Sequence, residues 1–243
     1  MDSSSSRRLL YTVRFMRTSV VLACLMLLLA ASSGDGENQN TTGPVGLVSP
    51  TPGAPVSARQ VEERRKILAD GKVTTEVVTS QVYRDSAGRV RMECRLGDGT
   101  TGSVEFVYLL DPVASLVIIL LPQEKVADRD TVPRSSSGSF QVGLPTTWRP
   151  LPKGKWKTKE EALGVRTIEG VETHGTRWVQ TSEDEPTLKA SFERWSSEAL
   201  TLTAEEKFVS PNWTHTAVLQ NIKRGEPDSA LFVVPADYTV RGP

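Results

Sequence analysis

Apolar and charged residues alternate along much of the chain after residue 58, and this pattern predicts β-strands. In residues 89–96 every second side chain is apolar: Val90, Met92, Cys94 and Leu96. A period of two places the apolar set on the core face of a sheet and the charged set in water. The Asp-Ser-Ala-Gly segment at residues 85–88 favours a turn, so residues 73–84 and 89–96 are predicted to form a hairpin.

A second predicted hairpin, residues 104–121, is the element around which we expect the sheet to be organised. Its two β-prone runs flank residues 111–115, where Pro112 fixes its own φ and favours a turn. Both runs are apolar on both faces, whereas a strand with one wet face would alternate. We therefore predict that other parts of the protein cover both faces of the hairpin, or that one of its faces lines an apolar cavity. The candidate ligand-binding residues are Phe106, Tyr108, Leu110, Leu116, Ile118 and Leu120.

The rest of the chain adds further strands and little helix. Strand-like segments occur at residues 58–68, 165–168, 171–181, 189–195, 199–208 and 214–222. Residues 169–170, Glu-Gly, fit a two-residue hairpin loop. Thr158 and Glu161 form a capping box, which predicts one short helix ending near Gly164, and residues 226–232 are expected to form a helical turn. We predict an all-β, mainly antiparallel fold, a curved meandering sheet or half-barrel with one or two short helices.

The N-terminus has the order of a secretory signal peptide. Four arginines precede an apolar run at residues 20–31, and small residues follow it. The run is shorter than the ~20 residues needed to cross a bilayer, so we predict a cleaved signal at residues 1–32. An uncleaved anchor in the inner membrane is the alternative. Residues 33–57 are predicted to be a disordered Pro- and Gly-rich tether, and residues 58–243 a single β domain with a mobile loop at 125–145. These features predict a periplasmic or extracellular protein.

The charges of the chain balance overall, and one segment concentrates basic residues. With 29 basic and 29 acidic residues, no overall field favours nucleic acid, and 38% hydrophobic residues suffice for a sizeable core. The local basic and aromatic cluster consists of Trp148, Arg149, Lys153, Lys155, Trp156 and Lys157. Such a cluster can hold phosphate or lipid head groups. The alternative is a set of solvated lysines beside packing tryptophans.

Motifs of catalysis are missing from the sequence. Residues 97–104 match the GxGxxGxV loop of protein kinases, but the other kinase elements are absent and a strand follows the glycines. We therefore predict an ordinary turn and no nucleotide site. His174 and His215 are the only histidines, and no GxSxG or HExxH motif occurs. Cys94, on the apolar face of its strand, is predicted to be a small buried hydrophobe. We expect no enzyme activity, metal or cofactor.

Six phrases between residues 53 and 240 carry a resemblance: GAPVS, LADGK, YRDSAGRVR, LDPVA, LGVRTIEGVETHGTR and RGEPDSALFVVPADYTV. They resemble phrases of a group of uncharacterised bacterial secreted proteins. More distantly, IEGVETHGTRW, RWSSEAL and LFVVPADYTV resemble, in order and phrase endings, exported domains related to the outer-membrane lipoprotein carrier. That resemblance implies a curved antiparallel sheet over an apolar cavity that shelters lipid chains.

Two functions are compatible with this sequence. The first is an exported binding protein whose apolar sheet face holds a lipophilic ligand or a lipoprotein acyl chain. The second is a non-catalytic structural or interaction module of the cell envelope, whose sheet is closed by its own core and contacts envelope proteins. The cavity distinguishes them: a void lined by Phe106, Tyr108, Ile118 and Leu120 supports binding, and a filled sheet supports the module.

Overall fold

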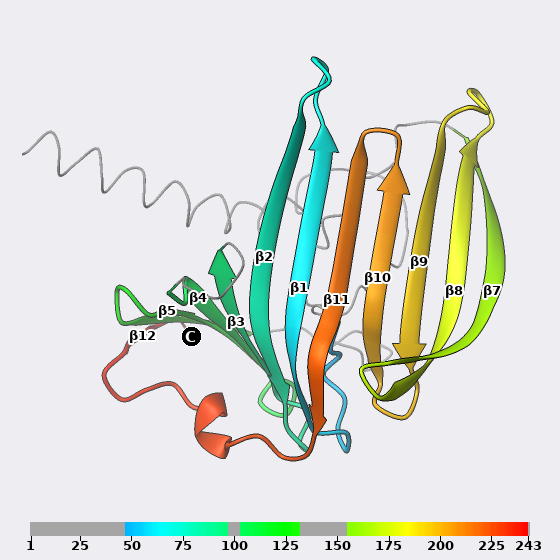
Figure 1. The fold of residues 1–243 in the computed structure, drawn as a ribbon. Helices are drawn as coiled ribbons and strands as arrows, with labels where there is room; N and C mark the ends of the chain where they lie inside the picture. Colours follow the sequence, from blue (N-terminus) through cyan, green and yellow to red (C-terminus); the bar gives the residue numbers. More distant parts are fainter. Residues whose placement is uncertain (1–46, 97–102, 132–154, 243) are drawn as a thin grey trace, which may run out of the picture.

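The structure, a computed structural model, describes residues 47–96, 103–131 and 155–242, and it confirms a mainly antiparallel all-β fold (Figure 1). The strands are β1 (Val56–Ile67), β2 (Val73–Arg84), β3 (Val90–Leu96), β4 (Phe106–Asp111), β5 (Leu116–Leu121), β6 (Val126–Thr131), β7 (Trp156–Ile168), β8 (Val171–Ser182), β9 (Lys189–Ser197), β10 (Leu202–Ser210), β11 (Trp213–Arg224) and β12 (Thr239–Arg241). They form one sheet in the order β12-β6-β5-β4-β3-β2-β1-β11-β10-β9-β8-β7. Two meanders, β1 to β6 and β7 to β11, are joined by pairing of β1 with β11.

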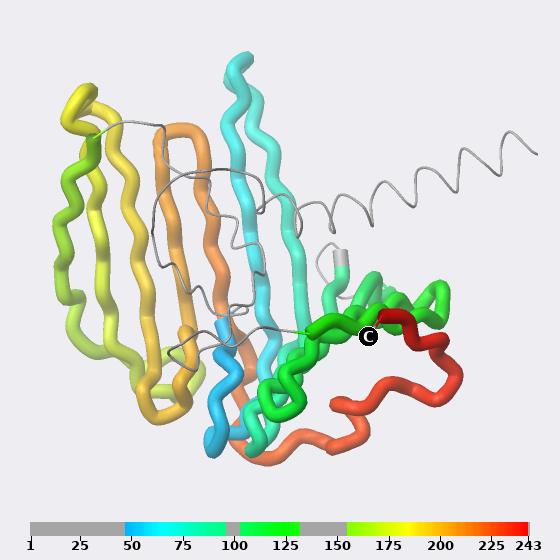
Figure 2. Tube along the Cα trace, turned by 180° about the vertical axis from the view of Figure 1, so that it is seen from behind, coloured from blue at the N-terminus to red at the C-terminus, as the bar shows by residue number. Residues whose placement is uncertain are grey.

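The sheet bends around one of its faces. Leu219 on β11, Val82 on β2 and Tyr108 on β4 belong to one buried cluster, although three strands separate β4 from β11. The long strands form a wall, and β3 to β6 turn away from it at β2 (Figure 1); Figure 2 shows the same arrangement from behind. We call the side that carries Leu219, Val82 and Tyr108 the concave face and the opposite side the convex face. Strand twist and bulges, such as the one between Thr203 and Glu205, produce curvature of this kind.

The central hairpin is confirmed, and its first strand is covered on both faces. Tyr108 and Leu110 of β4 lie in the concave-face core, while Val107 and Leu109 lie in a second buried cluster on the convex side. C-terminal residues, including Val234, pack against this second cluster. On β5 the cover is incomplete, because its residues are half-buried except for the buried Leu120.

The helix expected at residues 158–163 is wrong, because these residues lie within β7. β7 pairs with β8 along its whole length, and this pairing outweighs the local capping signal of Thr158 and Glu161. Gly164, the expected helix end, instead follows a register shift and has a φ of +84°. The predicted C-terminal turn is confirmed as a 3-10 helix at Ser229–Phe232. Among the described residues, no helix is long and apolar enough to span a membrane.

Two predicted flexible segments are partly ordered. Residues 126–131 of the expected loop at 125–145 form β6, where Ala127 is fully buried, and residues 132–145 lie outside the described ranges. At the end of the expected tether, Leu47 and Val48 are buried in the concave-face core, and Val48 pairs with Leu202. These residues were not recognisable as core because their packing partners lie far along the chain. The predicted signal at residues 1–32 also lies outside the described ranges.

A fully buried arginine ties this segment to the sheet. The Arg84 guanidinium donates hydrogen bonds to the carbonyl oxygens of Ser49 (2.8 Å), Ala54 (2.8 Å), Thr201 (3.0 Å) and Leu200. Burial lowers the pKa of Arg84 to about 10, so the side chain remains charged at neutral pH. One cation therefore holds two distant turns against the end of β2.

The lower half of the convex face is covered by the tip of the β7–β8 hairpin, which crosses β9 and β10 in Figure 1. The Glu169 carboxylate at this tip accepts a hydrogen bond from the Asn221 backbone N–H of β11 at 2.9 Å. Arg166 stacks 3.9 Å from the ring centre of Trp195 and forms an ion pair with Glu205. The upper half, near the β8–β9 and β10–β11 turns, is not crossed by this hairpin.

Candidate functional site

The six predicted ligand-binding residues do not share one face. Asp111 pairs with Leu116 and Leu109 with Ile118, so even-numbered residues of β4 share a face with odd-numbered residues of β5. Phe106, Tyr108 and Leu110 therefore face the concave side, and Leu116, Ile118 and Leu120 face the convex side. The expectation of one shared surface is wrong, because alternation within each strand does not define the register across the turn.

Tyr108 has a property that the other five lack. It is 3% exposed, and its hydroxyl has no hydrogen-bond partner within the described part of the chain. Burial raises the pKa of this phenol, so it remains protonated at physiological pH. The side chain acts as part of the packed core rather than as a wall of an open cavity.

The predicted basic and aromatic cluster is described only in part. Lys155 and Lys157 are exposed and Trp156 is half-buried, at the start of β7. The Lys157 ammonium lies 3.4 Å from the Glu183 carboxylate. Trp148, Arg149 and Lys153 lie outside the described ranges.

The concave face carries a row of aromatic side chains above the core. Trp178 of β8 pairs with Phe192 of β9, Phe192 with Phe208 of β10, and Phe208 with His215 of β11. The Trp178 and Phe192 rings stack with centroids 5.5 Å apart, and the Phe208 and Trp213 rings lie 5.1 Å apart. We call Trp178, Phe192, Phe208 and Trp213 the aromatic row. Phe208 is buried and the other three are half-buried, so the row offers ring surface to a ligand.

A charged cluster adjoins the aromatic row. The Glu62 carboxylate lies 3.0 Å from Arg64 Nη2 and 3.4 Å from His215 Nε2. The His215 ring stacks on Trp213 with centroids 5.8 Å apart, which links the two groups. Glu206, one strand further, accepts a hydrogen bond from Arg194 Nε at 3.2 Å and forms an ion pair with Arg194 Nη2 at 3.1 Å.

Burial and pairing act on the two glutamates in opposite directions. Burial by itself raises the pKa of Glu62, but the hydrogen bond with His215 and the charge of Arg64 outweigh it and lower that pKa to about 2. Burial raises the pKa of Glu206, and Arg194 only partly offsets this effect. Glu62 is thus held as a carboxylate, which suits it for an ion pair and not for proton transfer near neutral pH.

Folding lowers the pKa of Glu62 from 4.5 to about 2, and each pKa unit is worth ~1.4 kcal/mol. Replacing Glu62 with glutamine is therefore expected to lower the free energy of unfolding at pH 7 by about 3 kcal/mol. The folded-state pKa of Glu62 is depressed, so its contribution is present above pH 4.5 and is lost as the pH falls towards 2. Urea unfolding of both proteins from pH 7 to pH 3 measures this difference. The difference should shrink below pH 4.5, and the exposed control Glu198→Gln should show none. A difference that stays constant down to pH 3 would contradict the assignment.

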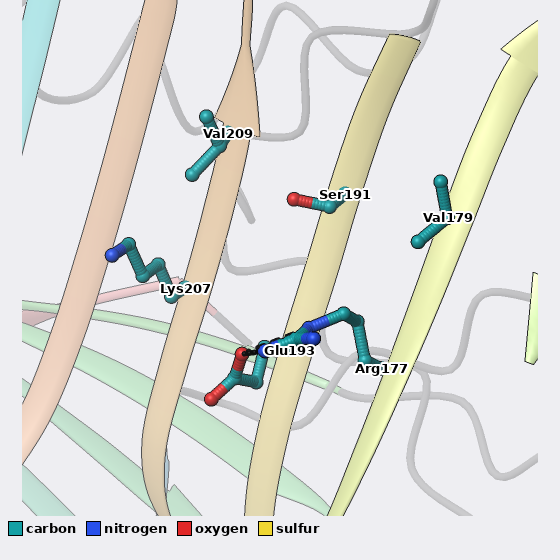
Figure 3. Close-up of a pocket in the computed structure, with 6 residues that line it drawn as sticks. All are labelled: Arg177, Val179, Ser191, Glu193, Lys207 and Val209. Atoms are coloured by element: carbon teal, nitrogen blue, oxygen red, sulfur yellow. Dashed lines mark hydrogen bonds and ion pairs between the residues drawn. The ribbon is translucent and has the colours of Figure 1, made fainter. Parts of the chain in front are cut away.

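The upper half of the convex face contains a hollow of about 350 Å³ (Figure 3). It is lined by Arg177, Val179, Ser191, Glu193, Lys207 and Val209 from β8, β9 and β10. Arg177 and Glu193 pair across its floor at 2.8 Å, as the dashed line in Figure 3 marks. We call this the convex hollow.

In the described part of the chain, no three His, Cys, Asp or Glu side chains gather as metal ligands. Cys94 is buried as predicted, with its sulfur 3.5 Å from the Ser80 hydroxyl. Aromatic surface beside fixed charges is an arrangement that binds amphipathic molecules.

Sequence reasoning missed the aromatic row and the charged cluster. Each aromatic residue was visible within its own strand, yet nothing local indicated that Trp178, Phe192 and Phe208 lie side by side. The available signal was an aromatic residue near the same end of each of four consecutive strands. Only the pairing register turns that signal into a continuous surface.

No known protein-family model and no curated protein sequence matches this chain. Several solved structures are similar to it at low sequence identity. The MucA/MucB complex of Pseudomonas aeruginosa is 14% identical with a TM-score of 0.41, over 77% of this chain and 58% of that chain. A LolA superfamily protein from Nitrosomonas europaea is 8% identical, with a TM-score of 0.35, over 77% and 92%. A putative outer membrane lipoprotein-sorting protein domain from Vibrio parahaemolyticus is 9% identical, with a TM-score of 0.30, over 77% and 91%.

Proposed function

We propose that this chain is an exported, non-catalytic binding protein of the cell envelope that holds a lipophilic ligand, such as an acyl chain, on its concave face. The aromatic row carries this proposal, because it places four rings side by side on a curved surface and leaves three of them half-exposed. Exposed aromatic surface of this extent is costly in water and is characteristic of binding sites. Export rests on the signal-like order of residues 1–32.

The charged cluster supports an amphipathic ligand rather than a purely apolar one. Arg64 and Arg194 lie on the same face as the rings, and each is paired with a glutamate. A polar head group placed here would meet fixed charges, while its hydrocarbon tail would lie over Phe192 and Trp178. The Arg194 guanidinium already lies 4.9 Å from the Phe192 ring centre, so polar and apolar surfaces are continuous.

The second candidate is a structural or interaction module. The dense packing of the central hairpin favours it, because Tyr108, Leu110 and Leu120 are buried and leave no open surface. In that case the concave face would dock a protein rather than a lipid. The two functions differ in whether the protein binds a small lipophilic probe.

Binding of N-phenyl-1-naphthylamine, a lipophilic fluorescent probe, tests the proposal. Phe192→Ala is expected to weaken probe binding about 5-fold, since losing contact with one ring costs ~1 kcal/mol. Phe232→Ala removes a half-buried phenylalanine outside the row and should leave binding unchanged. Ile118→Asn, on the convex side, should also leave it unchanged. Absence of probe binding by the wild type, or equal losses in Phe192→Ala and Phe232→Ala, would reject the concave site and favour the module.

A further inference from the structure

On the upper half of the convex face, four exposed cations have no ion-pair or hydrogen-bond partner for their side chains among the residues that the structure describes: Arg65, Lys159, Lys189 and Lys207. The pairing register places them around the convex hollow. Lys159 pairs with Val179, which lines the hollow, and Arg65 pairs with Thr214, the partner of Val209. Lys207 itself lines the hollow, and Lys189 pairs with Thr181, two residues beyond Val179 on the same face.

The neighbouring acids do not neutralise these lysines. Glu193 accepts hydrogen bonds from Arg177 at 2.8 and 3.2 Å and from the Trp195 indole at 2.8 Å. Glu161 lies 3.9 Å from Arg177, so it too is directed at that guanidinium. Glu63, the remaining acid in these rows, is two strands from Lys207. Glu183, Asp184 and Glu185 in the β8–β9 turn lie at the upper edge of this face, where Glu183 pairs with Lys157. The acids nearest the hollow are directed at Arg177, so the charged side chains beside it that have no partner among the described residues are cations.

The hollow combines donors with apolar surface. Lys207 and Ser191 line the same depression, and within the described residues neither side chain has a hydrogen-bond or ion-pair partner. In Figure 3 the Lys207 ammonium points towards β11, and its flexible stem allows it to turn back over the hollow. Val179 and Val209 line it as well. From β7 to β1 the convex face spans six neighbouring strands, so it is about 24 Å wide at the usual strand spacing of ~4.8 Å. A broad, cationic surface with scattered apolar residues complements an extended anionic surface rather than one small molecule.

We propose that the upper half of the convex face docks on a bilayer of anionic phospholipids, with Lys207 and Ser191 holding a lipid phosphate in the convex hollow. Each basic residue close to an anionic membrane contributes about 1 kcal/mol, and the valines contact the head-group region. Lys155, from the predicted basic cluster, is exposed just before β7, whereas Lys157 is paired with Glu183. The proposal rests on export of the protein but not on ligand binding at the aromatic row.

Sedimentation with vesicles of phosphatidylglycerol and phosphatidylcholine in equal parts, or of phosphatidylcholine alone, tests this docking. The wild type should bind only the anionic vesicles, and its binding should weaken with added salt. The triple variant Lys159→Gln, Lys189→Gln and Lys207→Gln should bind them about 100-fold more weakly, at about 5-fold per charge. The control triple Lys125→Gln, Lys223→Gln and Arg224→Gln removes equal charge elsewhere and should lose less than about 5-fold.

Three outcomes would overturn membrane docking. They are equal binding to phosphatidylcholine vesicles, equal losses in the two triple variants, and binding to soluble polyglutamate that is as tight as to anionic vesicles. Thermal unfolding verifies that both triples are folded. Probe binding at the aromatic row should be unchanged in the convex-face triple, so a failure of membrane docking is separable from a failure of the concave site.

Discussion

Replacing Arg84 with methionine is expected to lower the free energy of unfolding by about 4–6 kcal/mol, one of the two largest effects expected in this protein. Arg84 is 0% exposed, and its guanidinium donates hydrogen bonds to the carbonyl oxygens of Ser49, Ala54, Leu200 and Thr201. Methionine fills a similar volume but donates no hydrogen bond, so these buried acceptors lose their partner. Each such loss costs about 1–3 kcal/mol, and more where the bond was to a charged group.

Thermal unfolding measures this effect. For a domain of this size 1 kcal/mol corresponds to roughly 2–4 °C, so the melting temperature should fall by about 10–20 °C. Arg84→Lys keeps the charge but not the planar fork of donors, so its melting temperature should lie between those of the wild type and Arg84→Met. The exposed control Arg224→Met should change the melting temperature by less than about 2 °C. A loss for Arg84→Met no larger than this control would show that the two turns hold without the cation.

Replacing Val107 with aspartate is expected to cost about 4 kcal/mol or more, because β4 is covered on both faces. Val107 is 3% exposed and packs with Leu109 and Leu120 under the C-terminal segment. The cross-strand partner of Val107 is Glu93, whose carboxylate is already paired with Arg91 and Arg95, so a carboxylate at position 107 would face a like charge. An unpaired buried charge either stays ionised at high cost or takes up a proton with a raised pKa.

Urea unfolding at pH 7 measures the stability of this variant, and Val165→Asp is its matched control. Val165 is also a strand valine, but it is 58% exposed on β7, so its change should cost less than about 1 kcal/mol. Tyr108→Asp, on the concave side of the same strand, should be as damaging as Val107→Asp. If Val107→Asp leaves stability unchanged, the C-terminal segment does not cover the hairpin in solution, and only the concave face of β4 is core.

The alternation of residue types by itself determined most strands and their turns. Val90, Met92 and Cys94 occupy the core face as the period of two predicted. Glu169 and Gly170 form the expected two-residue loop, with φ values of +50° and +74° that suit a type I′ turn. The absence of a wet face in residues 104–110 predicted either a strand covered on both faces or the wall of an apolar cavity, and β4 is covered on both faces. These features depend on residues within one strand or one turn, so local sequence contains the information.

The tertiary structure alone decided which strands became neighbours and in what register. A shift of one residue across the turn at residues 111–116 moved Ile118 and Leu120 to the face opposite Tyr108. Pairing with β8 converted a capped helical segment at Thr158 into a strand. The aromatic row, the charged cluster and the contacts of Arg84 join segments up to 153 residues apart. Contacts at such separation depend on the free energy of the whole sheet, which no single stretch of sequence encodes.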